Sequence, residues 1–387
     1  MTLPPFVGAS SAAPALPVVL LYRKGPKVAP RGHEADTLRE LARQIAELKG
    51  TQLAGEFDEA CAYPAHRYLI PDDTLTLADA RKLGVRSVRD LYGGVVPFPF
   101  VATKLIAHGL PDDAKVSPPG WSHAFSSRTA SLVLPGYSAF SRDDARNAAR
   151  ILLEGGRVRV KRPYGIGGAG QTLVANRDQL EAELDALGDE ALREGIVIER
   201  HLDAIETFSA GQIEIDDMIA SYYGVQHLTV NNHGHRVYGG TDLAVVRGGF
   251  NALVRLELPE NIREAIAKAR AFDATVHSDY AGFFASRRNY DVARGFDEAG
   301  VLHCGVLEQS WRVGGATGAE IGALRTFRAE PHAHLVYAST REIYGKNVRL
   351  PAGACVVYSG VDAHAGQITK YYTPGGERRK GASIDDS

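Results

Sequence analysis

The glycine-rich segment 165–170, with the sequence GIGGAG, limits the folds open to this chain more than any other stretch. It has the spacing GxGxxG, and because glycine has no Cβ atom, its backbone N–H groups can come close to phosphate oxygens. A dinucleotide-binding fingerprint or a P-loop needs a helix that begins at the last glycines. Here the β-branched run 172–174 follows, and Gln171 stands where a P-loop has its lysine. The segment is therefore predicted to be a turn between two strands, either a phosphate-binding flap or a structural hairpin.

The residues around this turn predict a small strand–loop–strand–helix–strand unit. Ser141 has the form of a helix cap, and a glycine pair closes the helix that it starts. A strand at 158–161 comes next and ends in Lys161, directly before the glycine turn. After the turn, Asn176 caps a second helix, and the strand 196–198 follows. A lysine on the strand that enters a glycine turn is well placed to meet phosphates.

Acidic residues lie on the later strands of the chain. Glu199 directly follows the strand 196–198, and Glu206 lies a short way beyond it. Asp291 and Glu308 lie on two successive apolar segments. Magnesium prefers hard oxygen ligands and is bound through one or two carboxylates plus phosphate oxygens. Acids on neighbouring strands suit this ion, although a single acid at a strand end is more often only a solvated residue.

In this order, the lysine, the glycine turn, the acidic hinge and the acid pair resemble the ATP-grasp superfamily of ligases. The superfamily pattern has an acid on one strand and Glu-x-Asn-x-Arg on the next, and this chain has Asp291 and then Glu308, Ser310 and Arg312. Ser310 stands where the superfamily usually has asparagine, and its hydroxyl is a shorter oxygen ligand. The whole chain further resembles an uncharacterised bacterial family, a domain of unknown function, within this superfamily.

The resemblance implies an α/β (α+β) architecture, namely an ATP-grasp fold with an N-terminal α/β pre-ATP-grasp unit. The apolar run 18–22, followed by Leu38, Leu41, Ile45 and Leu48 at helical spacing, predicts a β–α beginning for that unit. We expect four parts: 1–115 as the N-terminal unit, 116–200 as a small lid subdomain with the glycine flap, 201–345 as a large subdomain with the magnesium site, and 346–387 as C-terminal strands with a disordered tail.

The resemblance also implies two cofactors, ATP and Mg²⁺, and a role for each matching residue. Asp291, Glu308 and Ser310 would hold the metal, and Arg312 would face the transferred phosphoryl group. Arg287 and Arg288 are candidates to bind the acyl phosphate, or else ordinary surface arginines. Lys161 is expected to face the nucleotide and not the core. The implied nucleotide-binding residues are Lys104, Lys161, Gly165, Gly167, Gly168, Gly170, Glu199, Leu202 and Glu206. A further glycine-rich segment, 314–318, precedes a predicted helix whose N-terminus could bind a substrate carboxylate.

Such an enzyme would activate a carboxylate as an acyl phosphate for attack by an amine or other nucleophile, and would release ADP and phosphate. Two alternatives remain open. The serine at position 310 favours a catalytically silent ATP-binding module. A biotin-carboxylase-like subunit would need its biotin from another protein, because the chain has two methionines and no Met-Lys pair. The sequence identifies neither the carboxylate nor the nucleophile.

Composition excludes several other classes of function. A formal net charge of −2 gives no general attraction to nucleic acid. Cys61, Cys304 and Cys355 lie far apart, which indicates neither a disulfide framework nor a zinc cluster. The start of the chain lacks the basic residues of an export signal, and no long apolar run predicts a membrane helix. We expect a cytoplasmic enzyme with small-molecule carboxylate and nucleophile substrates, no nucleic acid or membrane partner, and a homodimer as an open option.

Overall fold

The computed structural model describes residues 18–24, 32–64, 66–164 and 170–374. Its N-terminal unit contains a parallel sheet in the order β2-β1-β3. The bounds are Val18–Tyr22 (β1), His33–Leu48 (α1), Leu53–Glu56 (β2) and Arg67–Pro71 (β3). The predicted first strand and first helix are confirmed, since the apolar spacing of α1 buries Leu41, Ile45 and Leu48 on one face.

A second small sheet joins the N-terminal unit to a distant part of the chain. Its order is β13-β5-β4, so a short strand from the second half pairs with two from the first. The bounds are Leu75–Thr76 (β4), Leu77–Leu83 (α2), Gly94–Val96 (β5) and Phe284–Ala285 (β13). Two short 3₁₀ helices follow β5, at Pro99–Ala102 (η1) and Lys104–Ala107 (η2), and lead toward the lid.

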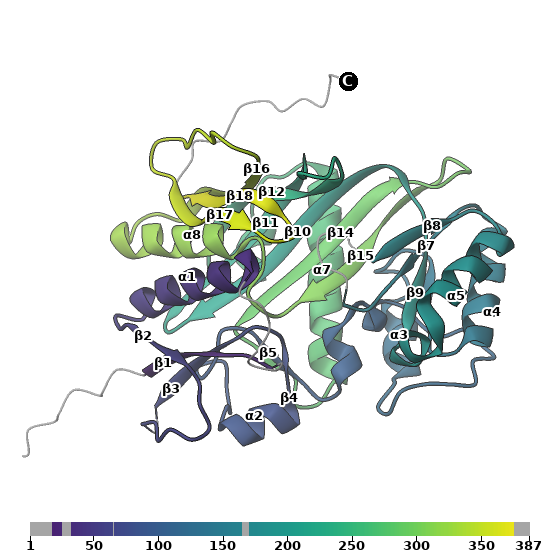
Figure 1. Cartoon of the computed structure of the whole chain (residues 1–387), viewed down its shortest axis with the longest axis horizontal. Helices are drawn as coiled ribbons and strands as arrows, with labels where there is room; N and C mark the ends of the chain where they lie inside the picture. Colours follow the sequence, from purple (N-terminus) through teal and green to yellow (C-terminus); the bar gives the residue numbers. More distant parts are fainter. Residues whose placement is uncertain (1–17, 25–31, 65, 165–169, 375–387) are drawn as a thin grey trace, which may run out of the picture.

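The lid consists of an antiparallel sheet in the order β6-β9-β7-β8 with α4 and α5 packed on one face (Figure 1). Both predicted caps are confirmed, because Ser141 and Asn176 accept hydrogen bonds from backbone N–H groups in the first turns of these helices. The bounds are His123–Thr129 (α3), Gly136–Ala139 (β6), Arg142–Leu153 (α4), Val158–Lys161 (β7), Gln171–Val174 (β8), Arg177–Glu194 (α5) and Ile196–Arg200 (β9).

The large sheet has eight strands in the order β15-β14-β10-β11-β12-β16-β18-β17, and each neighbouring pair is antiparallel. Although residues 346–387 are expected to form a separate part, β17 and β18 extend this sheet. The tail beyond residue 374 lies outside the described residues. The bounds are Asp203–Ile215 (β10), Met218–Val230 (β11), Arg236–Arg247 (β12), Arg287–Phe296 (β14), Leu302–Ser310 (β15), Leu335–Tyr344 (β16), Cys355–Asp362 (β17) and Gly366–Thr373 (β18).

Helices cover the two faces of the large sheet unequally (Figure 1). On one face, α7 packs along β10, β14 and β15, together with the short α6. On the other face, α1 and α8 cover the central strands. The bounds of the helices not yet given are Phe250–Val254 (α6), Glu260–Asp279 (α7) and Thr317–Ala329 (α8). Because successive side chains of a strand point to opposite faces, each residue of β14 and β15 belongs either to the α7 face or to the α1/α8 face.

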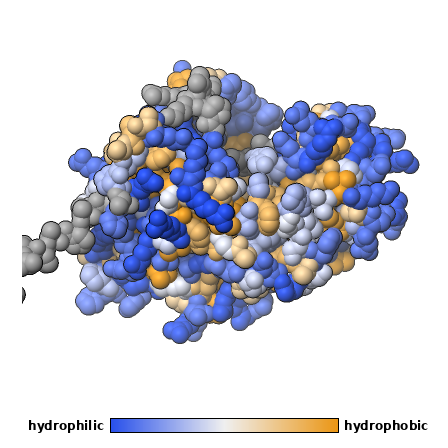
Figure 2. Space-filling model, turned by 90° about the horizontal axis from the view of Figure 1, so that it is seen from below, coloured by the Kyte–Doolittle hydropathy of each residue, from blue (hydrophilic) through white to orange (hydrophobic). Residues whose placement is uncertain are grey.

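The surface seen from below is mostly hydrophilic, with hydrophobic residues gathered in separate patches (Figure 2). Within the described part of the chain, none of the helices combines the length and the apolar character that crossing a membrane would require.

Candidate functional site

Two carboxylates face each other across the strand pair β14–β15. Asp291 and Glu308 are direct cross-strand partners, so their side chains lie on the same face of the large sheet, which is the α1/α8 face. Oδ1 of Asp291 accepts hydrogen bonds from Ser209 Oγ at 3.0 Å and from Asn289 Nδ2 at 2.9 Å. Both of these donors use the same oxygen, and Gln226 is a further hydrogen-bond partner of this carboxylate.

The environment of this acid pair suits a divalent cation. Burial raises the pKa of Asp291 above its ordinary value, and the nearby charge of Glu308 raises it further. A cation between the two carboxylates would relieve this repulsion. Across the described residues there is no group of three or more His, Cys, Asp and Glu side chains arranged to hold a metal. The protein side of the site is thus a two-carboxylate site, and this donor set fits magnesium that takes its other ligands from phosphates and water.

Ser310, the third predicted metal ligand, is engaged by an arginine. It is the cross-strand partner of Asn289, and this pair lies two residues along each strand from the acid pair. Arg287 Nη1 lies 3.1 Å from the Ser310 carbonyl oxygen and 3.3 Å from its Oγ. The hydroxyl therefore lies beside the acid pair, but it already accepts a hydrogen bond from a buried guanidinium.

Lys104 reaches the acid pair from the segment before the lid. Its Nζ atom lies 2.9 Å from Glu308 Oε2, and the lysine is buried. The neighbouring side chain, Gln309, donates hydrogen bonds to the carbonyl oxygens of Val101 and Thr103 at 2.8 Å each. Gln309 thereby fixes the backbone on the N-terminal side of Lys104 against β15. Lys104 and Glu308 are therefore in contact in the structure. From the sequence, only the resemblance to ATP-grasp ligases related the two residues.

Lys161 belongs to a second charged group, which is centred on Glu199 of the lid. Its Nζ atom lies 2.5 Å from Glu199 Oε1, and His108 Nε2 lies 3.0 Å from Glu199 Oε2. All three side chains are buried. The expectation that Lys161 faces away from the core needs correction, because in this structure its charge is buried against Glu199. Burial works against ionisation of Glu199, but the charge of Lys161 and the hydrogen bond with His108 lower its pKa to about 2.

The glycine turn joins two paired strands, as predicted. Lys161 at the end of β7 pairs with Gln171 at the start of β8, and no helix begins after the turn. The Arg162 N–H donates to the Gly170 carbonyl oxygen at 2.9 Å, and Gly170 has φ +70°, a conformation that favours glycine. Three residues of the predicted flap lie outside the described residues: Gly165, Gly167 and Gly168.

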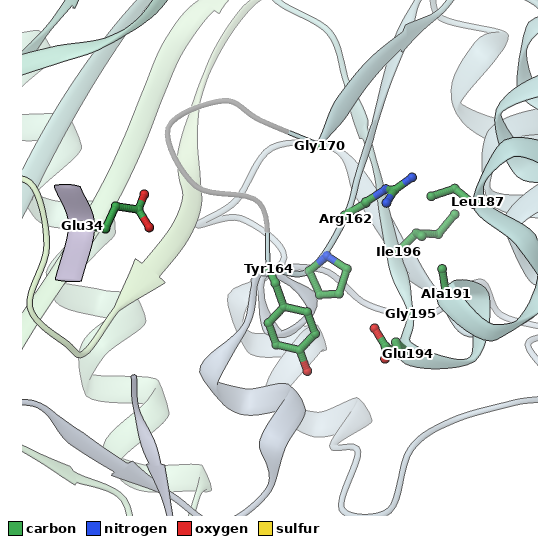
Figure 3. Close-up of a pocket in the computed structure, with 10 residues that line it drawn as sticks. Glu34, Arg162, Tyr164, Gly170, Leu187, Ala191, Glu194, Gly195 and Ile196 are labelled. Atoms are coloured by element: carbon green, nitrogen blue, oxygen red, sulfur yellow. The ribbon is translucent and has the colours of Figure 1, made fainter. Parts of the chain in front are cut away.

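A cavity of about 480 Å³ lies beside the described end of the flap (Figure 3). Arg162 and Tyr164 line it, together with Glu194 and its neighbours at the end of α5. Glu34, from the first turn of α1, lies across the gap from Tyr164 in Figure 3. The described residues that line this cavity do not include Asp291, Glu308 or Lys161. Its described lining therefore comes from α1 and from the lid.

Two predicted residues of the hinge lie on different faces of the large sheet. Leu202 is buried in a small apolar cluster with Leu134 and Ala293, and Ala293 shares the face of Asp291. Glu206 pairs with Arg294 in the register of β10 and β14, and their side chains lie 3.5 Å apart. The structure does not bring Glu206 to the Asp291 face, because Glu206 has the parity of Phe208, which packs on the α7 side.

The two predicted catalytic arginines also separate. Arg288 follows the parity of the α7 face, and its guanidinium forms an ion pair with Asp273 of α7 at 2.9 Å. It is therefore not brought together with Asp291. Arg312 lies just after β15, and its Nε atom lies 3.5 Å from Asp73 of the N-terminal unit. Arg312 thus remains a candidate at the boundary between this unit and the acid pair.

The glycine segment before α8 has the predicted relation to a helix start. Helix α8 begins at Thr317, two residues earlier than the expected helix, and its N-cap, Ala316, supplies no side-chain hydrogen bond. The Gly314 N–H donates to Thr317 Oγ1 at 3.0 Å. A carboxylate site at this helix start remains a prediction.

Several residues of the site had no role in the sequence prediction. His108 and Ser209 carry no motif, and only the packing of the lid and the strand register reveal them. Asn289 carried a usable signal, because it precedes Asp291 by two positions on the same strand and must share its face. Arg287 differs from these residues, because the sequence names it with Arg288 as a candidate for the acyl phosphate; the fold buries it in an ion pair with Glu320.

The comparisons with known proteins agree with this architecture. A family model described as "Protein of unknown function (DUF3182)" matches residues 21–372. No curated protein matches the chain in sequence. A pyruvate carboxylase from Rhizobium etli is similar in structure, with 10% identity and a TM-score of 0.50, over 93% of this chain and 36% of that chain. At this identity the likeness concerns the fold alone, which is the ATP-grasp fold.

Two further solved structures are similar over most of their own length. The phosphoribosylamine–glycine ligase of Thermotoga maritima has 13% identity and a TM-score of 0.49, over 93% of this chain and 90% of that chain. The biotin carboxylase domain of the Hydrogenobacter thermophilus 2-oxoglutarate carboxylase has 12% identity and a TM-score of 0.49, over 92% of this chain and 86% of that chain.

Proposed function

We propose that this chain, which belongs to the DUF3182 family because the family model matches residues 21–372, is an ATP-dependent ligase. The observation that carries the proposal is the meeting of Lys104 with the Asp291–Glu308 pair, two acids on one face and a lysine from another part of the chain. Phosphoryl transfer requires alignment and charge stabilisation more than covalent chemistry from the protein. A cluster of this composition supplies both.

The reaction proposed is the activation of a carboxylate. The substrate carboxylate oxygen attacks the γ-phosphorus of ATP, the bond to ADP breaks, and an acyl phosphate forms. An amine or other nucleophile then attacks the acyl carbon, and phosphate leaves. Asp291 and Glu308 would hold magnesium, which supplies charge neutralisation for the phosphates. Lys104, which contacts Glu308, and Lys161 would add positive charge for the phosphates, and Arg312 would stabilise the transferred group.

The first test is binding of the nucleotide. Millimolar Mg-ATP should raise the melting temperature of the protein through linkage, and Mg-GTP serves as the control for nucleotide class. The variant Asp291→Asn/Glu308→Gln should lose the part of the shift that depends on magnesium. An absent shift for the wild-type protein would contradict the proposal.

The second test identifies the reaction. Carboxylate and amine pairs are screened for release of ADP and phosphate, and the nucleotide products are separated by chromatography. Accumulation of AMP would mean attack at the α-phosphorus and would remove the roles given to Asp291, Glu308 and Arg312. Binding of Mg-ATP without consumption in every mixture would favour the catalytically silent module instead.

A further inference from the structure

A buried polar network lies next to the acid pair, and no step of the proposed reaction uses it. Its members are Arg287, Glu320, Tyr92 and Tyr222. Arg287 and Glu320 form an ion pair with Nη2 and Oε1 2.7 Å apart, and both side chains are buried. Two buried tyrosines bind the same carboxylate. Tyr92 OH donates to Glu320 Oε2 at 2.6 Å, and Tyr222 OH lies 2.8 Å from Glu320 Oε1. Buried ions of this kind need a full set of hydrogen bonds, because each unpaired polar group is costly.

Only one of these tyrosines extends the network to the acid pair. Tyr222 OH also lies 2.9 Å from Asn289 Oδ1, and Asn289 Nδ2 donates to Asp291 Oδ1 at 2.9 Å. The amide of Asn289 thus has its oxygen held by the tyrosine and its nitrogen directed at the carboxylate. A rotation of this amide would place Asn289 Oδ1 against Asp291 Oδ1, so the carboxylate fixes which way the amide points. The Tyr222 hydroxyl has a single proton, which Asn289 Oδ1 shares with Glu320 Oε1, and this contact holds the amide in place.

The side chain of Tyr222 on β11 reaches Asn289 on β14 across the strand between them, β10. Tyr222 on β11 pairs with Gly211 on β10, and Gly211 pairs with Asn289 on β14. A Cβ atom at position 211 would lie 2.4 Å from the Cζ and OH atoms of Tyr222. A glycine is therefore required at this position by close approach, because any larger residue would exclude the phenol ring from the surface of β10.

We infer that Tyr222 is a positioning residue for the metal: through Asn289 it holds Asp291 Oδ1 and so fixes the orientation of this carboxylate beside Glu308, its cross-strand partner. This inference rests on the proposed function, since it concerns the magnesium site of that reaction. Outer residues that orient a metal ligand commonly change metal affinity by 10-fold to 100-fold when they are replaced. Tyr92 binds the same Glu320 from the N-terminal unit, whereas the side-chain hydrogen bonds of Asn289 go to Tyr222 and Asp291, so Tyr92 provides a matched control.

The test compares Tyr222→Phe with Tyr92→Phe. The affinity for ADP is measured by calorimetry in EDTA and again with Mn²⁺. The ratio of the affinity with Mn²⁺ to the affinity in EDTA reports how strongly the site holds the metal. We expect Tyr222→Phe to reduce this ratio by on the order of 10-fold, with the ADP affinity in EDTA unchanged. Tyr92→Phe, which also loses one hydroxyl to Glu320, should keep the wild-type ratio. The electron paramagnetic resonance spectrum of bound Mn²⁺ should change in Tyr222→Phe only.

Each outcome has one meaning. An unchanged ratio in Tyr222→Phe, or an equal loss in Tyr92→Phe, would overturn the inference while leaving the proposed function intact. A wild-type protein whose ADP affinity does not respond to Mn²⁺ would overturn the proposed function itself. If Tyr222→Phe does not fold, Asn289→Leu takes its place: a reduced ratio supports the inference, and a wild-type ratio overturns it.

Discussion

The Lys104 ammonium lies 2.9 Å from Glu308 Oε2, although the two residues come from different parts of the chain. Gln309, next to Glu308, makes this approach possible, because its amide holds two carbonyl oxygens at positions 101 and 103. The lysine charge is therefore paired with a carboxylate that is proposed to bind magnesium. Under this proposal, Lys104 and the metal would compete for Glu308, and phosphate groups would offer the lysine another partner.

Replacement of Lys104 should separate these two roles. We expect Lys104→Met to bind Mn²⁺ more tightly than the wild-type protein without nucleotide, because the competing charge is gone. The same variant should bind ATP more weakly, because it lacks a cation for the phosphates. Calorimetric titrations with Mn²⁺ and with ATP measure both effects. Lys49→Met is the control, since Lys49 is a buried lysine whose partner, Asp216, lies in a turn outside the site. Weaker Mn²⁺ binding in Lys104→Met would rule out competition.

Glu308→Gln should abolish turnover and leave the fold intact. The amide keeps the shape of the side chain but removes the charge that holds magnesium, and we expect a loss of at least about 100-fold in kcat. Steady-state release of ADP measures the effect, and the melting temperature checks the fold. Glu342→Gln is the matched control, because Glu342 also forms an ion pair with a lysine, Lys370, at 3.0 Å on the same sheet. Activity of Glu308→Gln within a few-fold of wild type would remove Glu308 from the metal site.

Asp291→Asn should stabilise the metal-free protein at neutral pH while it weakens metal binding. Asp291 is held close to Glu308 with a raised pKa, so its charge is unfavourable until a cation neutralises the pair. Active-site groups commonly carry such a cost in stability. Thermal unfolding in EDTA measures the gain, and unfolding with Mg-ATP should show the opposite order. A lower melting temperature for Asp291→Asn in EDTA would contradict the repulsion between the two carboxylates.

Lys161→Ala should destabilise the protein as well as weaken ATP binding. The substitution leaves Glu199 buried without its principal counter-charge, and breaking a buried ion pair from one side costs about 3–5 kcal/mol. Lys161→Met/Glu199→Gln removes both charges and should recover most of this stability without recovering ATP affinity. Chemical unfolding and nucleotide titration measure the two quantities separately. Equal destabilisation by the single and double variants would contradict the pairing.

The same pair predicts how stability depends on pH. The folded-state pKa of Glu199 is lowered to about 2, so its ionised form stabilises the fold above its unfolded pKa of about 4.3. This contribution is lost as the pH falls from about 4.3 toward 2. The stability difference between the wild-type protein and Glu199→Gln should therefore be largest near neutral pH and shrink over that interval. Unfolding curves at a series of pH values measure the difference, and a constant gap down to pH 3 would contradict the assignment.

The sequence by itself determined the local elements and the chemical type of the site. Helical spacing in α1, the caps of α4 and α5, and the β-branched run after the glycine turn depend on neighbouring residues, and these elements formed as predicted. The acids on β14 and β15 were recognisable for the same reason, since each lies on its own apolar strand.

Only the tertiary structure decided which side chains meet. Strand parity directs Arg288 and Glu206 to the α7 face, and a shift of one residue in register reverses such an assignment. The pairing of Lys161 with Glu199 depends on how β7 and β9 align, which no single strand encodes. Tyr222 reaches Asn289 only because Gly211 leaves space on the strand between them. Contacts of this kind join residues that are distant in the chain, so their physical basis is the packing of the whole sheet.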